Sequence, residues 1–326
     1  MHEVLLAETT YQRLRSEFDS LENVRYVTLN ETGVLRSAGE ELSMDEFDLS
    51  MLLMDVDLFQ QGQMERLLEM LTDSRSLEYV HTAAAGLDSP IFRVIADKAK
   101  VFCNSNAQAP AIAEFVVASV LNRWHRFDVL AENQKQANWQ GNEFKQVLGS
   151  NWLIIGFGNV GQLIARQVHG FGASITGVRR STADNEFADR VCKLADVPDF
   201  LDQADVVVLS CSLNSATEGL VDSAFLKAMK NNAVLVNIGR GALIDDAALL
   251  AALDESEIDY AVLDVFQTEP LPTESRFWSH EKVQVTPHSS YAGSKTTERY
   301  DRMFVENLKR YVAGDEVFNL VDPGSF

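Results

Sequence analysis

The chain has 326 residues, enough for two domains that each bury a core of their own. Its composition, 46% hydrophobic and 23% charged, is typical of a packed globular protein and excludes a disordered or fibrous one. The formal net charge of −20 repels nucleic-acid phosphates and anionic lipids, so we expect no nucleic-acid or membrane partner. The acidity also has a plainer explanation, because a charged surface keeps a protein in solution.

The three cysteines, Cys103, Cys192 and Cys211, are widely separated and form neither a CxxC pair nor a Cys/His ligand spacing. This pattern predicts reduced thiols and no metal site. The first residues lack the regions of an export signal, and no apolar run reaches the roughly 18 residues of a membrane span. These features predict a cytoplasmic protein.

Apolar runs alternate with segments of helical spacing from the first residues onward, and this alternation predicts βα units that feed a parallel sheet. In the first hundred residues we expect strands at 4–7, 25–29, 49–54, 77–81 and 100–102. Helices are expected at 10–18, 62–71 and 90–97. These elements predict a first α/β domain.

The stretch 109–136 is predicted as one helix linking two halves of the chain, because apolar residues recur there at three- and four-residue spacing. A second sheet follows, with strands expected at 151–155, 174–178, 206–210, 233–238, 260–265 and 283–286. A last helical pattern, 294–312, stops at Gly314, a predicted C-cap glycine. The fold class is therefore α/β, with two flavodoxin- or Rossmann-like, doubly wound parallel-sheet domains and a cleft between them.

A glycine-rich segment, GFGNVG at 156–161, lies directly after a predicted strand and directly before a predicted helix. In a dinucleotide-binding turn the first glycine permits the tight turn, the second admits the pyrophosphate, and the third lets helix and strand pack closely. This context favours a cofactor site over a merely glycine-rich turn. The predicted contacts are Gly156, Gly158, Asn159, Val160 and Gly161.

The acidic residue that usually holds the adenosine ribose, about 20 residues further on, is missing. The second strand of this domain ends instead in Arg179, Arg180 and Ser181. A guanidinium binds a 2′-phosphate through paired, charge-assisted hydrogen bonds. Two arginines after a strand can also be a solvated surface pair, but their register favours NADP as the cofactor, with NAD as the alternative.

Polar segments follow three successive strands of the second sheet, at 237–241, 264–270 and 286–290. Ligands bind at the carboxyl ends of such strands. Arg240 can bind a substrate carboxylate, His288 can give a proton to a carbonyl oxygen, and Glu269 can orient the imidazole. Taken singly, each residue could equally belong to an ordinary surface loop. Together they predict a site for 2-oxo-acid reduction.

Several motifs occur in one order along the chain, and together they resemble the D-isomer-specific 2-hydroxyacid dehydrogenase family. The resemblance runs from about Leu77 to Gly293. It rests on AAGLD at 84–88, AEF at 113–115, GFGNVG, VNIGRGALID at 236–245, LDVFQTEPLP at 263–272 and TPHSSYAG at 286–293. The chain looks like a glyoxylate/hydroxypyruvate reductase-like or other 2-oxo acid reductase-like member.

The resemblance implies Arg240, Glu269 and His288 as the catalytic set. It also implies that Asp264 and Ile238 lie near the nicotinamide, and Cys211 is included among the cofactor contacts. The backbone amides of Ala85 and Gly86 are expected to meet the substrate carboxylate, as is the Arg240 side chain. A homodimer is expected, with the helix near 109–126 in its interface.

These expectations place a discontinuous substrate-binding domain at 1–103 plus 291–326 and a dinucleotide-binding Rossmann domain at 104–290. The predicted function is hydride transfer between NADP(H) and a small 2-oxo acid or D-2-hydroxy acid. The alternative is a nicotinamide-sensing scaffold like the C-terminal binding proteins, which share this fold and can retain the catalytic set. Turnover of small 2-oxo acids distinguishes the two.

The predicted third strand of the first domain runs into Asp55 and Asp57. Two carboxylates close to a second anionic group on a substrate would repel it. We therefore expect a substrate with an uncharged or small polar side chain.

Overall fold

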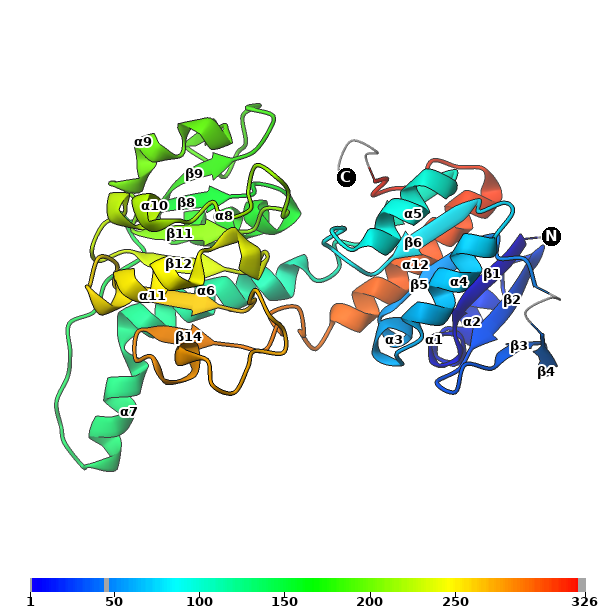
Figure 1. Ribbon diagram of the computed structural model, residues 1–326, viewed down its shortest axis with the longest axis horizontal. Helices are drawn as coiled ribbons and strands as arrows, with labels where there is room; N and C mark the ends of the chain where they lie inside the picture. The colour runs from blue at the N-terminus through cyan, green and yellow to red at the C-terminus, as the bar shows by residue number, and fades with distance from the viewer. Residues whose placement is uncertain (1, 44–46, 322–326) are drawn as a thin grey trace. The chain divides into compact units, whose positions relative to one another are not determined.

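The computed structural model describes residues 2–43 and 47–321 (Figure 1). They form two compact units, each built on a seven-stranded sheet. Unit 1 comprises the described residues of Met1–Gln108 and Ser294–Phe326, and unit 2 is Ala109–Gly293. The predicted domain ranges also include residues 1, 44–46 and 322–326, which lie outside the described residues.

The sheet of unit 1 has the order β4-β3-β2-β1-β5-β6-β7. Its parallel strands are β1 (His2–Ala7), β2 (Val24–Leu29), β5 (Met51–Met54), β6 (Tyr79–Thr82) and β7 (Val101–Asn104). These are the five strands that the apolar runs predict. An antiparallel extension, β3 (Leu35–Ser37) and β4 (Glu40–Leu42), was not predicted, because three residues are too few to show a period.

Helices cover both faces of this sheet. They are α1 (Glu8–Arg13), α2 (Arg15–Phe18), α3 (Val56–Gln60), α4 (Met64–Asp73), α5 (Pro90–Lys98) and α12 (Thr296–Ala313). The predicted C-terminal helix is confirmed as α12, and Gly314 caps it with a left-handed φ of 76°. Its residues Phe304 and Leu308 pack with Leu6 and Leu53 of β1 and β5, so the C-terminal segment belongs to unit 1.

The sheet of unit 2 is parallel throughout and has the order β10-β9-β8-β11-β12-β13-β14. The strands are β8 (Asn151–Ile155), β9 (Ser174–Val178), β10 (Arg190–Cys192), β11 (Val206–Leu209), β12 (Val234–Asn237), β13 (Tyr260–Leu263) and β14 (Val283–Val285). Six were predicted, and the short edge strand β10 was not. Successive strands are added on one side of β8 up to β10, and then on its other side from β11 onward. Dinucleotides bind in such folds at the point between β8 and β11 where the strand order reverses.

Side chains of each central strand alternate between two cores. Trp152 and Ile154 face the core that contains α6 (Ala109–His125) and α8 (Asn159–Gly170). Leu153 and Ile155 face the core that contains α9 (Pro198–Leu201), α10 (Ser223–Ala228) and α11 (Asp246–Asp254). Because both faces are covered, these strands are continuous apolar runs.

The predicted single helix at 109–136 is wrong, since it is two helices, α6 and α7 (Phe127–Lys135). Arg126 separates them in a left-handed conformation, with φ of 52°. The apolar stripe of α6 is buried as far as Trp124, whereas α7 has no buried residue. In the described part of the chain, α7 therefore buries too little apolar surface to be held in line with α6. Among the described residues, no helix has the length and apolar character that a membrane span requires.

Candidate active site

The glycine-rich turn lies between β8 and α8, at the reversal point of the unit 2 sheet. Gly156 has φ of 102°, and a Cβ there would overlap the backbone of Ser210 and Cys211 after β11. Gly158 is the residue before α8, and Gly161 packs against the Gly156 carbonyl. The exposed N-terminus of α8 thus follows a turn in which Gly156 and Gly158 have no side chain and the Phe157 ring is buried, a geometry that fits a pyrophosphate.

Asn159 and Val160 are the first two residues of α8, so both lie at this turn. On its other side, the Ser210 hydroxyl donates to the Gly156 carbonyl at 2.9 Å. Burial raises the pKa of the neighbouring Cys211 thiol to about 11. Cys211 is therefore a neutral residue beside the turn and is not suited to act as a thiolate.

The arginine pair lies after β9, as its register predicts. The Arg179 guanidinium donates to the carbonyl of Ser181 at 2.9 Å and to that of Ala183 at 2.6 Å. It also lies 5.9 Å from the centre of the Phe157 ring, inside the glycine-rich turn. Arg180 and Ser181 are exposed. The carboxyl end of β9, next to the glycine-rich turn, is therefore positively charged.

His288 and Glu269 are in direct contact. The imidazole Nδ1 lies 2.8 Å from Glu269 Oε2, and Glu269 Oε1 accepts a hydrogen bond from the Phe266 amide at 2.9 Å. Each oxygen of the Glu269 carboxylate thus has its own partner, which fixes the orientation of the carboxylate. When Nδ1 donates to Glu269, Nε2 is the ring nitrogen that can exchange a proton with a substrate.

Arg240 lies in the loop after β12, the strand next to β13, and so at the same carboxyl end of the sheet as Glu269. The buried Asn237 side chain forms this loop, since its Nδ2 donates to the Arg240 carbonyl at 2.9 Å and its Oδ1 accepts from the Gly239 amide at 3.1 Å. Half-buried Ile238 donates its amide to Leu209 of β11 at 3.1 Å. The parallel register therefore brings Arg240 and the His288–Glu269 pair to the carboxyl ends of neighbouring strands.

Asp264 follows β13, at the carboxyl ends of the unit 2 strands, and its expected place near the nicotinamide stays a prediction. Asp264 has no exposed surface, and its carboxylate accepts hydrogen bonds from Thr286, Ser289 and Ser290. Sequence reasoning missed Asn237, Thr286 and Ser290 as residues that shape the site. The sequence signal that could have identified them is a polar residue at the end of an apolar run that predicts a buried strand.

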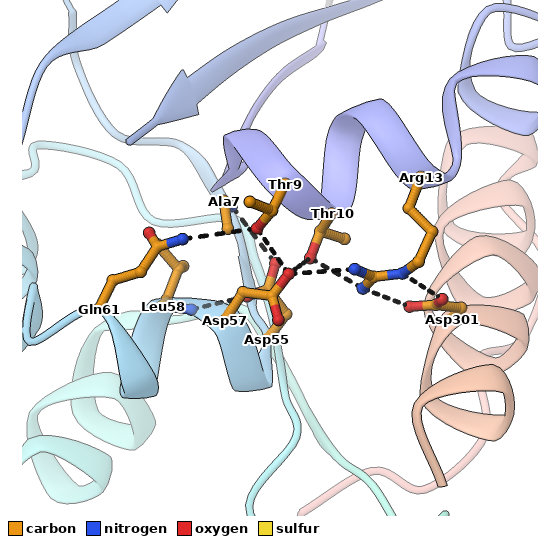
Figure 2. Close-up of polar contacts among 9 residues, drawn as sticks. All are labelled: Ala7, Thr9, Thr10, Arg13, Asp55, Asp57, Leu58, Gln61 and Asp301. Carbon is orange, nitrogen blue, oxygen red and sulfur yellow. Dashed lines mark hydrogen bonds and ion pairs between the residues drawn. The ribbon is translucent and has the colours of Figure 1, made fainter. Parts of the chain in front are cut away.

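The unit 1 residues of the predicted site follow β5 and β6. Ala85 and Gly86 come shortly after β6, where Ala85 is exposed and Gly86 is half-buried. At the end of β5, Asp55 caps α3 by accepting from the Leu58 amide at 2.9 Å (Figure 2). Burial raises the pKa of Asp55 to about 6.

Asp57 is not the free carboxylate that the substrate argument assumed. It pairs with Arg13 of α1 at 3.1 Å, and Arg13 also binds Asp301 of α12 at 2.7 Å (Figure 2). The Thr9 hydroxyl donates to Asp57 as well, at 2.6 Å. Arg13 therefore offsets the charge of Asp57, and the expectation of a substrate with an uncharged or small polar side chain stays a prediction.

Gly241 lies where the loop after β12 approaches the turn after β13. A Cβ at this position would overlap the carbonyl carbon of Phe266 and the amide nitrogen of Gln267, in the turn that leads to Glu269. We therefore expect Gly241→Ala to lower the free energy of unfolding by about 1–3 kcal/mol or more, because the backbones must separate.

Gly170→Ala at the end of α8 is the matched control, since a Cβ there meets no atom within 4 Å. Alanine at a helical glycine raises stability by roughly 0.5–1 kcal/mol. Urea unfolding of both variants measures the difference. Equal stability of the two variants would mean that the 241 and 266 loops do not pack as described.

Comparison with known proteins places the chain in a family. The sequence model described as "D-isomer specific 2-hydroxyacid dehydrogenase, NAD binding domain" matches residues 117–290, more than half of the chain. A glyoxylate/hydroxypyruvate reductase B of Enterobacter sp. (strain 638) is 32% identical over 231 residues, 67% of this chain and 69% of that one.

Solved structures show the same fold over the whole chain. A D-isomer specific 2-hydroxyacid dehydrogenase family protein from Aeromonas salmonicida subsp. salmonicida A449 has a TM-score of 0.78 and 27% identity, covering 99% of both chains. An NADPH-dependent glyoxylate/hydroxypyruvate reductase from Sinorhizobium meliloti, solved with NADP and sulfate, has a TM-score of 0.76 and 22% identity, covering 100% of this chain and 99% of that one. The predicted fold class and the resemblance are thus confirmed, and the chain belongs to the D-isomer-specific 2-hydroxyacid dehydrogenase family, with its NAD-binding domain in residues 117–290.

Proposed function

We propose that the protein reduces small 2-oxo acids to D-2-hydroxy acids with NADPH, and catalyses the reverse oxidation. The observation that carries this proposal is the 2.8 Å contact between His288 and Glu269 at the sheet edge that also bears Arg240. Glyoxylate and hydroxypyruvate are the first candidate substrates, because the relative from Enterobacter is a reductase of both by name.

In the proposed reaction each side chain has one task. The bound nicotinamide supplies the hydride. Arg240 binds the substrate carboxylate with its guanidinium, which matches a carboxylate in two parallel hydrogen bonds. The His288 imidazolium gives its Nε2 proton to the carbonyl oxygen and becomes neutral, while its Nδ1–H stays on the ring and donates a hydrogen bond to Glu269, which orients the ring. The amides of Ala85 and Gly86 are proposed as further partners of the carboxylate.

The first prediction concerns His288. Replacing it with alanine is expected to lower kcat for glyoxylate reduction by about two to four orders of magnitude, because general acid catalysis contributes that much. NADPH affinity is expected to persist, since the cofactor turn is a separate loop. Steady-state turnover and a fluorescence titration with NADPH measure the two quantities.

His169→Ala is the control, because His169 is an exposed histidine in the last turn of α8. This variant should keep wild-type turnover. Near-wild-type turnover of His288→Ala would remove His288 from the reaction. If the wild-type protein binds NADPH but turns over none of glyoxylate, hydroxypyruvate or branched 2-oxo acids, the scaffold function is favoured instead.

The preference for NADP over NAD is supported by charge. An acidic residue at the end of β9 would accept hydrogen bonds from the ribose and would repel a 2′-phosphate. Arg179 is at that position, directly followed by Arg180. The relative from Sinorhizobium meliloti, solved with NADP, has the same fold. Two hydrogen bonds tie the Arg179 guanidinium to the carbonyls of Ser181 and Ala183, and it lies 5.9 Å from the centre of the Phe157 ring in the glycine-rich turn.

We expect kcat/KM to favour NADPH over NADH by roughly tenfold to more than a hundredfold, which corresponds to about 1.5–3 kcal/mol. Arg179→Asp should reduce or reverse this ratio, because a carboxylate repels the 2′-phosphate. Arg166→Asp, at an exposed position of α8, makes the same change in net charge and should leave the ratio unchanged. An equal ratio in all three proteins would show that the cofactor is selected elsewhere.

A homodimer is supported by apolar side chains that unit 2 leaves uncovered. Helix α7 and the segment after it project from the sheet of unit 2 (Figure 1). The exposed side chains on them include Phe127, Trp139, Phe144 and Leu148, and Trp139 is fully exposed. The helix expected in the interface, α6, is instead mostly buried within unit 2. We therefore propose that α7 and residues 136–148 contribute most of the interface.

Sedimentation of the wild-type protein is expected to give twice the chain mass of 36.3 kDa. A Phe127→Ser, Trp139→Ser double variant should dissociate, because aromatic anchors carry much of an interface's energy. Trp278→Ser alters a half-exposed tryptophan elsewhere in unit 2, and this variant should remain dimeric. A wild-type monomer would refute the dimer.

We propose a cytoplasmic location because the three cysteines are free thiols. Two of them, Cys103 and Cys192, are buried. Reduced thiols are the rule in that compartment. Fractionation of cells that produce the protein tests the location, and recovery from the periplasm or the medium would contradict it.

A further inference from the structure

The loop that follows β6 in unit 1 begins at a buried threonine. Thr82 is the last residue of β6 and has no exposed surface. Its hydroxyl oxygen accepts a hydrogen bond from the amide of Ala84, two residues further on, at 3.2 Å. A threonine hydroxyl that binds the backbone in this way takes the place of one backbone bond of a tight turn. The Thr82 side chain therefore fixes the direction in which the chain leaves β6.

Two further contacts hold this loop to unit 1. The Ala83 amide donates to the carbonyl of Met54, the last residue of the neighbouring strand β5, at 2.9 Å. At the far end of the loop, the partly buried Leu87 side chain packs against the core that also contains Leu52 and Val80. The loop is thus held before Ala85 and after Gly86.

The amides of Ala85 and Gly86 differ from the two that precede them. Within residues 2–43 and 47–321, nothing accepts a hydrogen bond from either amide. Ala85 is exposed and Gly86 is half-buried, so this part of the loop is open to a ligand. Successive backbone N–H groups without a partner form a site for an anion. Their value to a ligand depends on how well the loop fixes them beforehand.

We propose that Thr82 is a positioning residue for substrate binding, whose hydroxyl engages the Ala84 amide and so holds the amides of Ala85 and Gly86 in place for a carboxylate. This inference rests on the proposed function, in which these two amides bind the carboxylate of a 2-oxo acid. The proton donor of that reaction belongs to unit 2. Thr82 therefore acts on substrate affinity, through the loop, and not on the chemical step.

The test is a pair of substitutions in the full-length protein. Thr82→Val keeps the shape of the side chain but removes the oxygen that the Ala84 amide binds. We expect KM for glyoxylate to rise by about 3- to 10-fold, the factor that one neutral hydrogen bond contributes, while kcat changes by less than about twofold. Thr82→Ser keeps the hydroxyl and should restore most of the lost affinity.

A purely structural role predicts a different result. Thr82→Val would then lower the fraction of folded enzyme, so that kcat falls and KM stays that of the wild type, and this result would overturn the proposal. Equal KM values of the valine and serine variants would overturn it too. If Thr82→Val does not fold, Thr82→Ala serves instead, because the smaller side chain cannot clash, and a wild-type KM in that variant contradicts the proposal.

Thr28→Val is the matched control. Thr28 is a buried threonine near the carboxyl end of β2 in the same sheet, and its hydroxyl donates to the Arg36 carbonyl at 3.5 Å. The substitution is the same, but this hydroxyl does not contact the loop after β6. Thr28→Val should keep the KM of the wild type. If its KM rises as much as that of Thr82→Val, the effect is not specific to the loop and the proposal fails.

Binding of oxamate to the NADPH-saturated protein, measured by calorimetry, gives a readout that needs no turnover. Oxamate carries the carboxylate and neighbouring carbonyl of a 2-oxo acid but is not reduced. Its affinity should fall in Thr82→Val and not in Thr28→Val. This result in a protein without 2-oxo-acid reductase activity would refute the proposed function and keep the positioning role. An unchanged affinity in an active enzyme would refute the positioning role alone, and a wild-type protein that neither binds oxamate nor reduces a 2-oxo acid would refute both.

Discussion

Buried polar groups have to be hydrogen-bonded, and this requirement shapes the carboxyl edge of the unit 2 sheet. Asn237 ends β12 without exposed surface, and its side chain binds the backbone of Gly239 and Arg240. Asp264 does the same after β13, for the loop of His288. Buried polar side chains at the strand ends thus hold the loops that carry Arg240 and His288.

Close contacts between backbones join these loops to one another. Gly156 lies against the segment after β11, and Gly241 lies against the turn that leads to Glu269. A side chain at either position would separate two segments that must approach together. The cofactor turn, the Arg240 loop and the Glu269 turn therefore form one packed layer, and a change in one is felt in its neighbour.

Local charge, and not net charge, decides where anions bind. The chain carries −20 overall, yet Arg179, Arg180 and Arg240 all follow strands at one edge of the unit 2 sheet. In unit 1, Arg13 is engaged by two carboxylates, so it balances acidic charge there and adds no net positive charge. Cations at the strand ends are what an acidic protein needs to hold an anionic cofactor and substrate.

Most of the central strands, the cofactor turn and the three polar segments could be predicted from the sequence, because buried parallel strands are continuous apolar runs and their ends are polar. The edge strands β3, β4 and β10 could not, since three residues carry no readable period. The break at Arg126 could not either, because it depends on α7 burying none of its residues in the described part of the chain. Contact between Glu269 and His288 was expected and is present.

The amino-acid sequence shows which residue types follow each predicted strand, and these types indicate which chemistry the site can support. Only the tertiary structure decided which way those side chains point. Asp264 and Thr286 are 22 residues apart and meet because β13 and β14 are adjacent and parallel. A sequence shows that a carboxylate follows a strand. Whether that carboxylate faces a ligand or binds the neighbouring loop depends on strand register and burial, which exist only in the folded sheet.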